Sequence, residues 1–439
     1  MYLPSYVNLC MDKLEHAGFA AYAVGGCVRD SLLGLTPQDY DLCTNATPEQ
    51  MRKVFQDHRL ILAGEKHGTV GVLVEEEIVE ITTFRTEGGY RDNRHPGWVR
   101  FEAHIEADLS RRDFTVNAMA YSPTRGLADP FGGQADLKNK CLRAVGDAAT
   151  RFTEDALRIL RGVRFAVRYG LTPEKATETA MFSLAPRMDN LARERVFSEL
   201  CKLLPLVTAE DLLRFTPVLT QVLPELTPLV GFDQHSPHHA YDIFTHTAHV
   251  VAAVPGELPL RWAALLHDTG KPLSFYLDET GRGHFPDHAG KGAALADAAL
   301  LRLKAPTAFR NQVTTLIKLH MTPLEPDKRL LRRRLNQLGQ ETLEQLLQLQ
   351  EADAASKGIA ADISAFSQIR LCLQELLSED ACFSQKDLAI NGKDLVALGF
   401  VPGKSLGTCL DALLQQVLDE KLPNERSALL AAAESYPKA

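Results

Sequence analysis

Strand-like segments are confined to the first third of this chain, and no other feature of the sequence constrains the fold as strongly. Short runs of β-prone residues have the pattern of strands, at 20–26, 39–44, 59–63, 68–74 and 77–84. Intervening segments favour helices, at 5–17, 26–33 and 48–57. After about residue 150 the pattern is helical almost to the end, with interruptions at Pro and Gly. The sequence therefore predicts an α+β head followed by an all-α body.

Length and composition narrow the class of protein further. A chain of 439 residues predicts two to four domains, because domains usually contain about 100–200 residues. No apolar run reaches the ~20 residues of a membrane-spanning helix, so we expect no membrane contact. The eight cysteines form no CxxC pair, which favours a reducing, cytoplasmic location without structural zinc. The net charge of −8 means that any RNA contact must come from local basic clusters.

The most informative segment is a glycine turn at the end of the first predicted strand. Gly25 and Gly26 lie there, where backbone N–H groups at the start of a helix can approach a phosphate closely. Arg29 falls in the helix that follows and can add a charge-assisted contact to a triphosphate. The segment thus has the residues expected of a triphosphate-binding turn.

Two aspartates follow this turn. Asp39 and Asp41 stand two apart in a predicted strand, so both carboxylates point to the same face. Adjacent carboxylates repel each other unless a cation is present, and hard oxygen ligands suit Mg²⁺. Glu80, in a nearby predicted strand, offers a third carboxylate, and three carboxylates holding two Mg²⁺ ions would activate a 3′-hydroxyl and stabilise leaving pyrophosphate. The alternative is a solvated strand end, with Glu80 as an ordinary exposed residue.

Several ordered motifs now point to a known family. GGCVRDSLLG followed by DYD resembles the first motif of the class II tRNA nucleotidyltransferase and bacterial poly(A) polymerase superfamily. DLSRRDFTVNAMA (108–120), DPFGGQADL (129–137) and EDALRILRGVRFAVRYG (154–170) resemble its ribose-reading, hinge and nucleotide-selecting motifs. The resemblance implies a polymerase-β-like, mixed-sheet nucleotidyltransferase head. It also implies addition of CCA to the 3′ end of tRNA from CTP and ATP, without a nucleic-acid template.

The RRDF segment supplies groups for the phosphates and the sugar. Arg111 and Arg112 can meet phosphate, and Asp113 can accept a hydrogen bond from a ribose hydroxyl. The simpler alternative is that these residues cap a helix. Together with the turn and the following helix they complete the predicted nucleotide-binding set: Gly26, Arg29, Arg112, Asp113, Asp155, Arg158, Arg161 and Arg164.

The helix predicted to begin at Glu154 carries arginines on one face and apolar residues on another. A carboxylate and a guanidinium can together read the Watson–Crick edges of C and A. The resemblance implies that Asp155 and Arg158 form this amino-acid template and that Glu154 orients Arg158. The alternative is a helix N-terminus with favourable acids and an ion pair.

The segment at 85–108 contains Gly, Arg and Asp and suits a mobile loop beside the strands. In the family this loop assists the switch from CTP to ATP, and its loss accompanies enzymes that add only C. Its presence here, with Arg85, Arg91, Asp92 and Arg94, favours CCA or A addition over CC addition.

A second set of chemistry-bearing residues occurs in the helical part. Several His and Asp residues are spread along these helices, and their imidazoles and carboxylates can surround one or two transition metals. The order resembles that of the HD phosphohydrolase superfamily, whose His-Asp pair is followed by the GKP seen at 270–272. The predicted ligands are His246, His267, Asp268 and Asp353, with His288 and His320 completing a second site or binding phosphate. A divalent transition metal there would promote hydrolysis of a phosphate ester.

We therefore predict four domains with distinct roles. They are a nucleotidyltransferase head (1–145), a helical neck with the nucleotide-selecting helix (146–225), an HD domain (226–365) and a helical tRNA-binding tail (366–439). The competing hypotheses are an A-adding enzyme or poly(A) polymerase, an HD phosphatase or cyclic phosphodiesterase as the main activity, and an RNA-binding module without catalysis.

Overall fold

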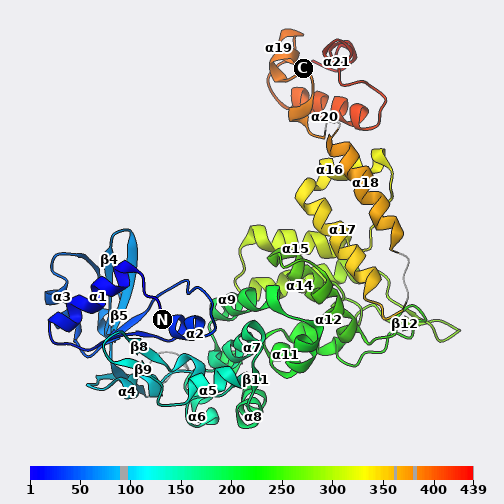
Figure 1. Ribbon diagram of the computed structural model, residues 1–439. Coiled ribbons are helices and arrows are strands. Elements are labelled where there is room, and N and C mark those ends of the chain that lie inside the picture. Colours follow the sequence, from blue (N-terminus) through cyan, green and yellow to red (C-terminus); the bar gives the residue numbers. More distant parts are fainter. Residues whose placement is uncertain (89–96, 360–362, 379–382, 439) are drawn as a thin grey trace. The chain divides into compact units, whose positions relative to one another are not determined.

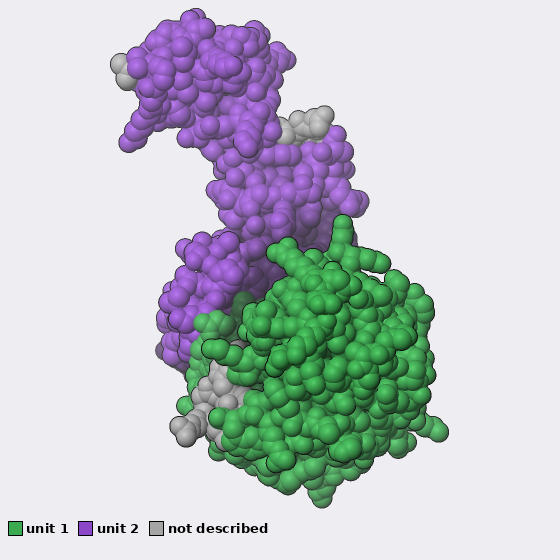
Figure 2. All heavy atoms as spheres, turned by 90° about the vertical axis from the view of Figure 1, so that its left-hand side faces the viewer, with its two compact units in different colours: residues 1–207, 211–224 green, residues 208–210, 225–439 purple. Residues whose placement is uncertain are grey.

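The computed structural model describes residues 1–88, 97–359, 363–378 and 383–438. The chain forms two compact units, residues 1–207 with 211–224 and residues 208–210 with 225–439 (Figure 2). Unit 1 contains the mixed head and the first helices of the body, and unit 2 contains the remaining helices (Figure 1). The predicted α+β head and helical body are confirmed.

The head is built on one seven-stranded sheet in the order β3-β4-β5-β2-β1-β8-β9. Its strands are β1 (Ala21–Val24), β2 (Leu42–Thr44), β3 (Arg59–Ile61), β4 (Thr69–Val74), β5 (Glu77–Thr83), β8 (Ala120–Ser122) and β9 (Gly126–Ala128). Strand β2 runs antiparallel to β1 and parallel to β5, so the sheet is mixed. All five predicted strands are present, and β8 and β9 extend the sheet beyond them.

Helix α1 (Ser5–His16) packs on this sheet because its apolar residues recur at helical spacing. Val7, Cys10, Met11 and Leu14 are buried, whereas the opposite face is polar. The remaining head helices are α2 (Gly26–Leu32), α3 (Pro48–Val54), α4 (Ile105–Ser110) and α5 (Gly133–Lys138).

Two local predictions need correction. Strand β2 begins at Leu42, so Asp39 and Asp41 lie in the segment that leads into it, although the Asp41 carbonyl still accepts a hydrogen bond from the Val24 amide at 3.0 Å. The predicted loop contains the hairpin β6 (Arg85–Gly88) and β7 (Trp98–Phe101). The residues between these strands, with Arg91, Asp92 and Arg94, lie outside the described residues.

The helical part of unit 1 follows the head. Its helices are α6 (Ala148–Glu154), α7 (Leu157–Tyr169), α8 (Lys175–Ser183), α9 (Arg193–Leu203), α10 (Ala209–Arg214) and α11 (Thr216–Val222). At the end of the head, the short strand β10 (Cys141–Leu142) pairs in parallel with β11 (Thr172–Pro173), which follows α7. Glu154 ends α6 and does not open the next helix as predicted, because Asp155 adopts an extended backbone that separates α6 from α7.

Unit 2 consists almost entirely of helices. They are α12 (Ile243–Ala253), α13 (Leu258–Leu266), α14 (His288–Arg302), α15 (Thr307–Leu319), α16 (Lys328–Leu338), α17 (Gln340–Ala355), α18 (Ser364–Ser378), α19 (Gly392–Ala397), α20 (Lys404–Leu418) and α21 (Arg426–Ala433). The short hairpin β12 (Tyr276–Leu277) and β13 (Gly283–His284) interrupts them. Helices α12 to α15 and α17 pack together, and α19 to α21 bury a separate core around Leu395 and Leu413. Within the described ranges, no helix is both long and apolar enough to cross a membrane.

Candidate active site and candidate metal centre

The three predicted carboxylates of the head line one cleft. Strands β2 and β5 run parallel, and their register places Leu42 opposite Ile81. Asp41 and Glu80, each one residue earlier, are therefore neighbours across the two adjacent backbone segments. Asp39 lies two residues before Asp41. All three line a cavity of about 420 Å³ at this edge of the sheet.

The electrostatics of the cleft suit a cation. Surrounding protein atoms partly exclude water from the Asp41 carboxylate and raise its pKa, and the negative charges of Glu80 and Asp39 act in the same direction. The Arg112 guanidinium opposes this shift. A divalent ion would relieve the repulsion among three hard oxygen donors, so these residues fit Mg²⁺.

Arg112 connects this carboxylate cleft to the glycine turn. Gly25 has a φ of 78°, which side-chain-bearing residues rarely adopt, and a Cβ at this position would lie 2.9 Å from Arg112 Nη1. The Arg112 side chain is held by Asp108, whose Oδ2 lies 3.2 Å from Arg112 Nη2. Asp108 is fully buried and also binds Arg111 at 2.8 Å. The turn therefore requires glycine because an arginine packs directly over it.

Arg29 lies beneath the turn and is buried. Its guanidinium donates to Asp30 at 2.7 Å, to Asn117 and to the Tyr169 hydroxyl, and it stacks over the Tyr169 ring at 4.3 Å. These contacts join α2 to α7 and occupy several of its donors. Contact between Arg29 and a triphosphate stays a prediction.

Buried Asp113 pairs with partly exposed Arg161 between the RRDF segment and α7. Asp113 Oδ2 accepts from Arg161 Nε at 2.9 Å and from Nη2 at 2.7 Å, and its Oδ1 accepts from Asn117 Nδ2 at 3.0 Å. Burial alone would raise the pKa of Asp113, but the Arg161 guanidinium and the Asn117 amide outweigh it and hold the pKa down to about 2. The carboxylate is therefore ionised at neutral pH and fixed in place by these partners.

The predicted template residues lie at the junction of α6 and α7. Arg158 Nη1 binds Glu154 Oε2 at 2.6 Å, and Arg158 also donates to the carbonyls of Arg151 and Arg111. The predicted contact between Glu154 and Arg158 is thus present. Asp155 accepts from the Leu157 amide at 3.0 Å, which caps α7. The Glu154 carboxylate and the Arg158 guanidinium thus lie side by side at the start of α7.

Long-range partners hold these residues, and the sequence did not single them out. Arg195 of α9 binds Asp155 at 2.9 Å, and Glu199 of the same helix binds Arg164 Nε at 2.6 Å. Arg164 and Glu199 are both buried. Helix α9 therefore carries the counter-charges for α7, a pairing for which local spacing gave no signal.

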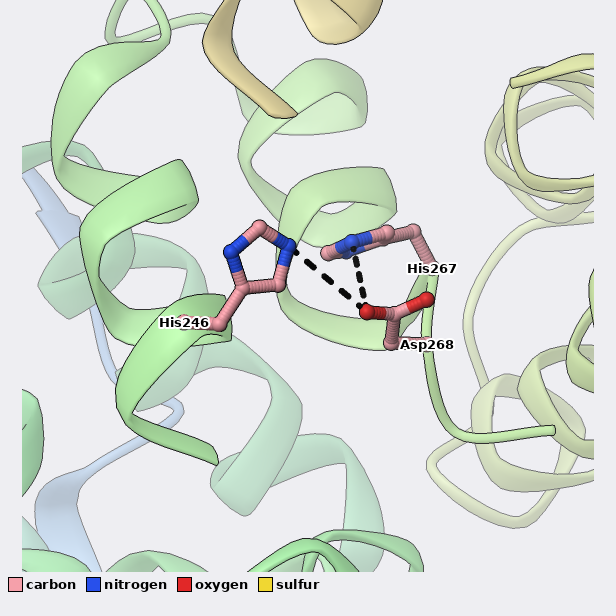
Figure 3. Close-up of side chains that lie close together, drawn as sticks. All are labelled: His246, His267 and Asp268. Atoms are coloured by element: carbon pink, nitrogen blue, oxygen red, sulfur yellow. Dashed lines mark ion pairs between the residues drawn. The ribbon is translucent and has the colours of Figure 1, made fainter. Parts of the chain in front are cut away.

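The six predicted ligands of the helical body meet in unit 2. Asp268 Oδ2 lies 3.7 Å from His246 Nε2 and 3.2 Å from His267 Nε2, and both histidines point at it from the ends of α12 and α13 (Figure 3). Asp353 of α17 lies 2.9 Å from His246 Nε2. On the other side, Asp268 Oδ1 lies 3.7 Å from His288 Nε2. Within the described ranges, two triplets bring their ligand atoms within 4.8 Å of one another: His246, His267 and Asp268, and Asp268, His288 and His320.

The hydrogen bonds of the four histidines fit metal binding. Each Nδ1 lies against a backbone carbonyl, of Ser356, Ala264, Phe285 and Ile317 respectively, and a carbonyl can only accept. Each Nδ1 therefore carries a proton, and Nε2 is the nitrogen that faces the cluster and is available to bind a metal. His288 Nε2 and His320 Nε2 face each other at 3.3 Å, where two lone pairs would repel without a cation.

The pKa values of this cluster favour charged acids and neutral outer histidines. Burial lowers the pKa of His320 to about 4 and lowers that of His288. Burial would also lower the pKa of His267, but the Asp268 carboxylate outweighs it and raises the pKa. The adjacent imidazoles hold the pKa of Asp268 well below its usual range. Neutral imidazoles and ionised carboxylates are the forms that bind divalent metals.

A cavity of about 250 Å³ opens beside this cluster. Besides four of the predicted ligands, Asp268, His288, His320 and Asp353, it is lined by residues that were not predicted as ligands, including Lys271, His239 and Lys357. Lys271 Nζ lies 2.7 Å from Asp268 Oδ2 and donates to Gln234 Oε1 at 2.8 Å. The His239 ring lies 5.3 Å from that of His246.

Three family models match parts of the chain. The poly A polymerase head domain matches residues 21–143, the probable RNA and SrmB-binding site of polymerase A matches residues 170–229, and tRNA nucleotidyltransferase domain 2 matches residues 289–433. The first match covers the sheet, the glycine turn and the three carboxylates of the head.

Whole-chain comparisons agree with these matches. A CCA-adding enzyme of Latilactobacillus sakei is 32% identical over 96% of this chain and 96% of its own length. One of Lactiplantibacillus plantarum is 34% identical over 96% of this chain and 93% of its own. The crystal structure of the Bacillus stearothermophilus CCA-adding enzyme in complex with CTP matches with a TM-score of 0.68 and 27% identity, over 99% of this chain and 97% of that one. The chain belongs to the family of class II CCA-adding enzymes, the tRNA nucleotidyltransferases with a poly A polymerase head.

Proposed function

We propose that this protein adds the 3′-terminal CCA sequence to tRNA from CTP and ATP, without a nucleic-acid template. The observation that carries the proposal is the convergence of Asp39, Asp41 and Glu80 on one cleft, beside a glycine turn covered by Arg112. Relatives that match nearly the whole chain are CCA-adding enzymes, and solved members of the fold are complexes with CTP, with ATP and with tRNA.

Nucleotidyl transfer is a displacement at phosphorus. The 3′-hydroxyl oxygen of the tRNA bonds to the α-phosphorus, the bond to pyrophosphate breaks, and the hydroxyl proton leaves to solvent. Mg²⁺ held by the three carboxylates would favour the ionised hydroxyl and neutralise charge on the pyrophosphate. The chain itself supplies Arg112 for the phosphates and Asp113 for a ribose hydroxyl.

Nucleotide choice rests in this proposal on Asp155 and Arg158. Their contacts with Arg195 and Glu154 hold both side chains, and a fixed hydrogen-bonding pair discriminates better than a mobile one. Arg161 and Arg164 act through their ion pairs with Asp113 and Glu199, which hold α7 in place. The described part of the β6–β7 hairpin favours full CCA addition over CC addition.

Substitution of the head carboxylates tests this proposal. Asp41→Asn and Asp39→Asn should abolish incorporation of labelled CTP and ATP into CCA-trimmed tRNA, with the circular dichroism spectrum unchanged. Glu76→Gln is the matched control, because Glu76 is an exposed carboxylate in the β4–β5 turn that does not line the cleft. Full activity in either aspartate variant would overturn the assignment.

A phosphohydrolase activity of unit 2 is a second candidate function. The observation that favours it is the buried cluster of His246, His267, Asp268 and Asp353, with His288 and His320 beside it. A divalent transition metal in this cluster would supply a nucleophile from water at neutral pH. The cavity next to the cluster gives a phosphate ester access to it.

Metal analysis separates the two activities. Asp268→Ala should lose the metal of unit 2 and any release of phosphate from nucleotides or from 2′,3′-cyclic ends, while CTP addition continues. A metal-loaded wild-type protein that hydrolyses none of these esters would reduce the cluster to a structural role.

A further inference from the structure

Part of the wall of the cavity beside the metal cluster contributes none of the predicted ligands. His239, Ser236 and Lys357 belong to this part of the wall, and Asp268, His288 and His320 line the same cavity. At about 250 Å³ the cavity lies below the ~300 Å³ lower end of ordinary ligand pockets. It therefore has room for a phosphate group and a small part of the alcohol attached to it.

His239 has an unused polar atom at this wall. Its Nδ1 is buried and has no hydrogen-bond partner within the described part of the chain. Buried polar atoms without a partner are rare in native proteins, and a bound group is one of the few explanations. The ring packs edge-on against His246 at 85°, so it cannot turn away freely.

Lys357 offers the cavity a positive charge. In the described ranges its ammonium forms no ion pair, unlike Lys271, which is committed to Asp268 and Gln234. Its carbonyl accepts from the Ala240 amide at 2.9 Å, which ties residue 357 to the chain next to His239. At the following residue, a Cβ on Gly358 would lie 2.7 Å from Tyr241 Cε2, so the two segments pack tightly. The two polar groups are thus held together by the backbone.

We propose that His239 and Lys357 form a phosphate clamp, which binds the non-bridging oxygens of a phosphate ester presented to the metal cluster of unit 2. This inference rests on the proposed metal centre and adds the substrate group that the centre acts on. An ammonium and an imidazole N–H are donors for phosphate oxygens, and neither has another partner to replace. The ligands of the cluster that line the same cavity would hold the metal next to this phosphate group.

Binding of methylphosphonate to Mn²⁺-loaded protein tests the clamp without catalysis, because its carbon–phosphorus bond is not hydrolysed. Calorimetry gives its Kd, and electron paramagnetic resonance of free Mn²⁺ gives metal affinity. Lys357→Met should weaken methylphosphonate binding about 10- to 100-fold and His239→Gln about 2- to 10-fold, with Mn²⁺ affinity unchanged. Lys318→Met is the matched control, because Lys318 is exposed on α15 and does not line the cavity.

The outcomes separate the clamp from the metal centre. Normal Mn²⁺ binding with unchanged methylphosphonate affinity in Lys357→Met overturns the clamp alone. Loss of Mn²⁺ in His239→Gln makes His239 a metal ligand and overturns its role in the clamp. If Asp268→Ala binds as much Mn²⁺ as the wild type, the metal centre itself is refuted, and the clamp with it.

Discussion

Replacing Gly25 by alanine isolates the contact between the glycine turn and Arg112. The added Cβ would lie 2.9 Å from Arg112 Nη1, closer than nonbonded atoms approach, whereas the nearest backbone atom, the Asn117 carbonyl oxygen, lies at 3.6 Å. The end of the arginine side chain must therefore move while the backbone around the turn stays. The backbone adds a second effect, because the φ of 78° at this position is strained for alanine and destabilises the fold.

The size of each effect follows from its physical origin. The unfavourable φ costs about 1–3 kcal/mol of folding free energy, which a chain of this size tolerates. Loss of one charge-assisted contact to phosphate costs about 1.5–3 kcal/mol of binding energy. We therefore expect kcat/KM to fall about 10- to 100-fold for CTP and for ATP alike, because both nucleotides share the triphosphate.

Gly18→Ala provides the control for strain. Gly18 has a φ of 83°, and nothing lies within 4 Å of the position of its Cβ. This variant should show similar destabilisation in thermal unfolding but wild-type kcat/KM with CCA-trimmed tRNA. Equal losses of activity in the two variants, or no loss in Gly25→Ala, would refute the reasoning.

Three other perturbations test the neck and its links to the head. Arg158→Ala should lower kcat/KM for both nucleotides at least tenfold and relax the choice between C and A, which sequencing of the products measures. Arg168→Ala, at an exposed position of the same helix, should change kcat/KM and the product sequence little. Glu199→Ala leaves a buried guanidinium without its partner, which costs about 3–5 kcal/mol and should lower the Tm by roughly 10 °C, against a small change for exposed Glu194→Ala. Because the pKa of Asp113 falls from 3.8 to about 2 on folding, its ionisation stabilises the fold above pH 3.8, and this stabilisation is lost as the pH falls through about 2. In urea titrations, the stability difference between wild type and Asp113→Asn should therefore shrink by roughly 2 kcal/mol over that range, and a constant difference would contradict it.

Local pattern was sufficient for much of the head. Alternating Val and Ile in 68–84 encode β4 and β5, and both strands form within a residue of their predicted bounds. Strands β8 and β9 were missed because each has only three residues; β8 pairs with β1 across about 100 residues of chain, and β9 pairs in turn with β8. Helix α7 begins later than predicted because Asp155 caps it instead of continuing it.

The same distinction between local sequence pattern and long-range contact applies to the site residues. Asp39 and Asp41 stand two apart just before β2 and Glu80 lies in β5, and the three carboxylates that the sequence predicted to act together line one cavity. Glu199 and Arg195 were not identifiable from the sequence, because their partners lie 35 and 40 residues away and no short-range periodicity records such pairs. His239 lies in a loop without periodicity, so only the fold brings it to His246.

The order in which nucleotides are added is a direct test of whether this protein builds the CCA end of tRNA. A tRNA lacking its CCA end is incubated with the protein and Mg²⁺, with CTP alone, with ATP alone and with both, and the 3′ ends are sequenced. We expect two added C residues with CTP alone and a complete CCA end with CTP and ATP together. Incorporation of ATP without any incorporation of CTP would contradict it and identify an A-adding enzyme or a poly(A) polymerase.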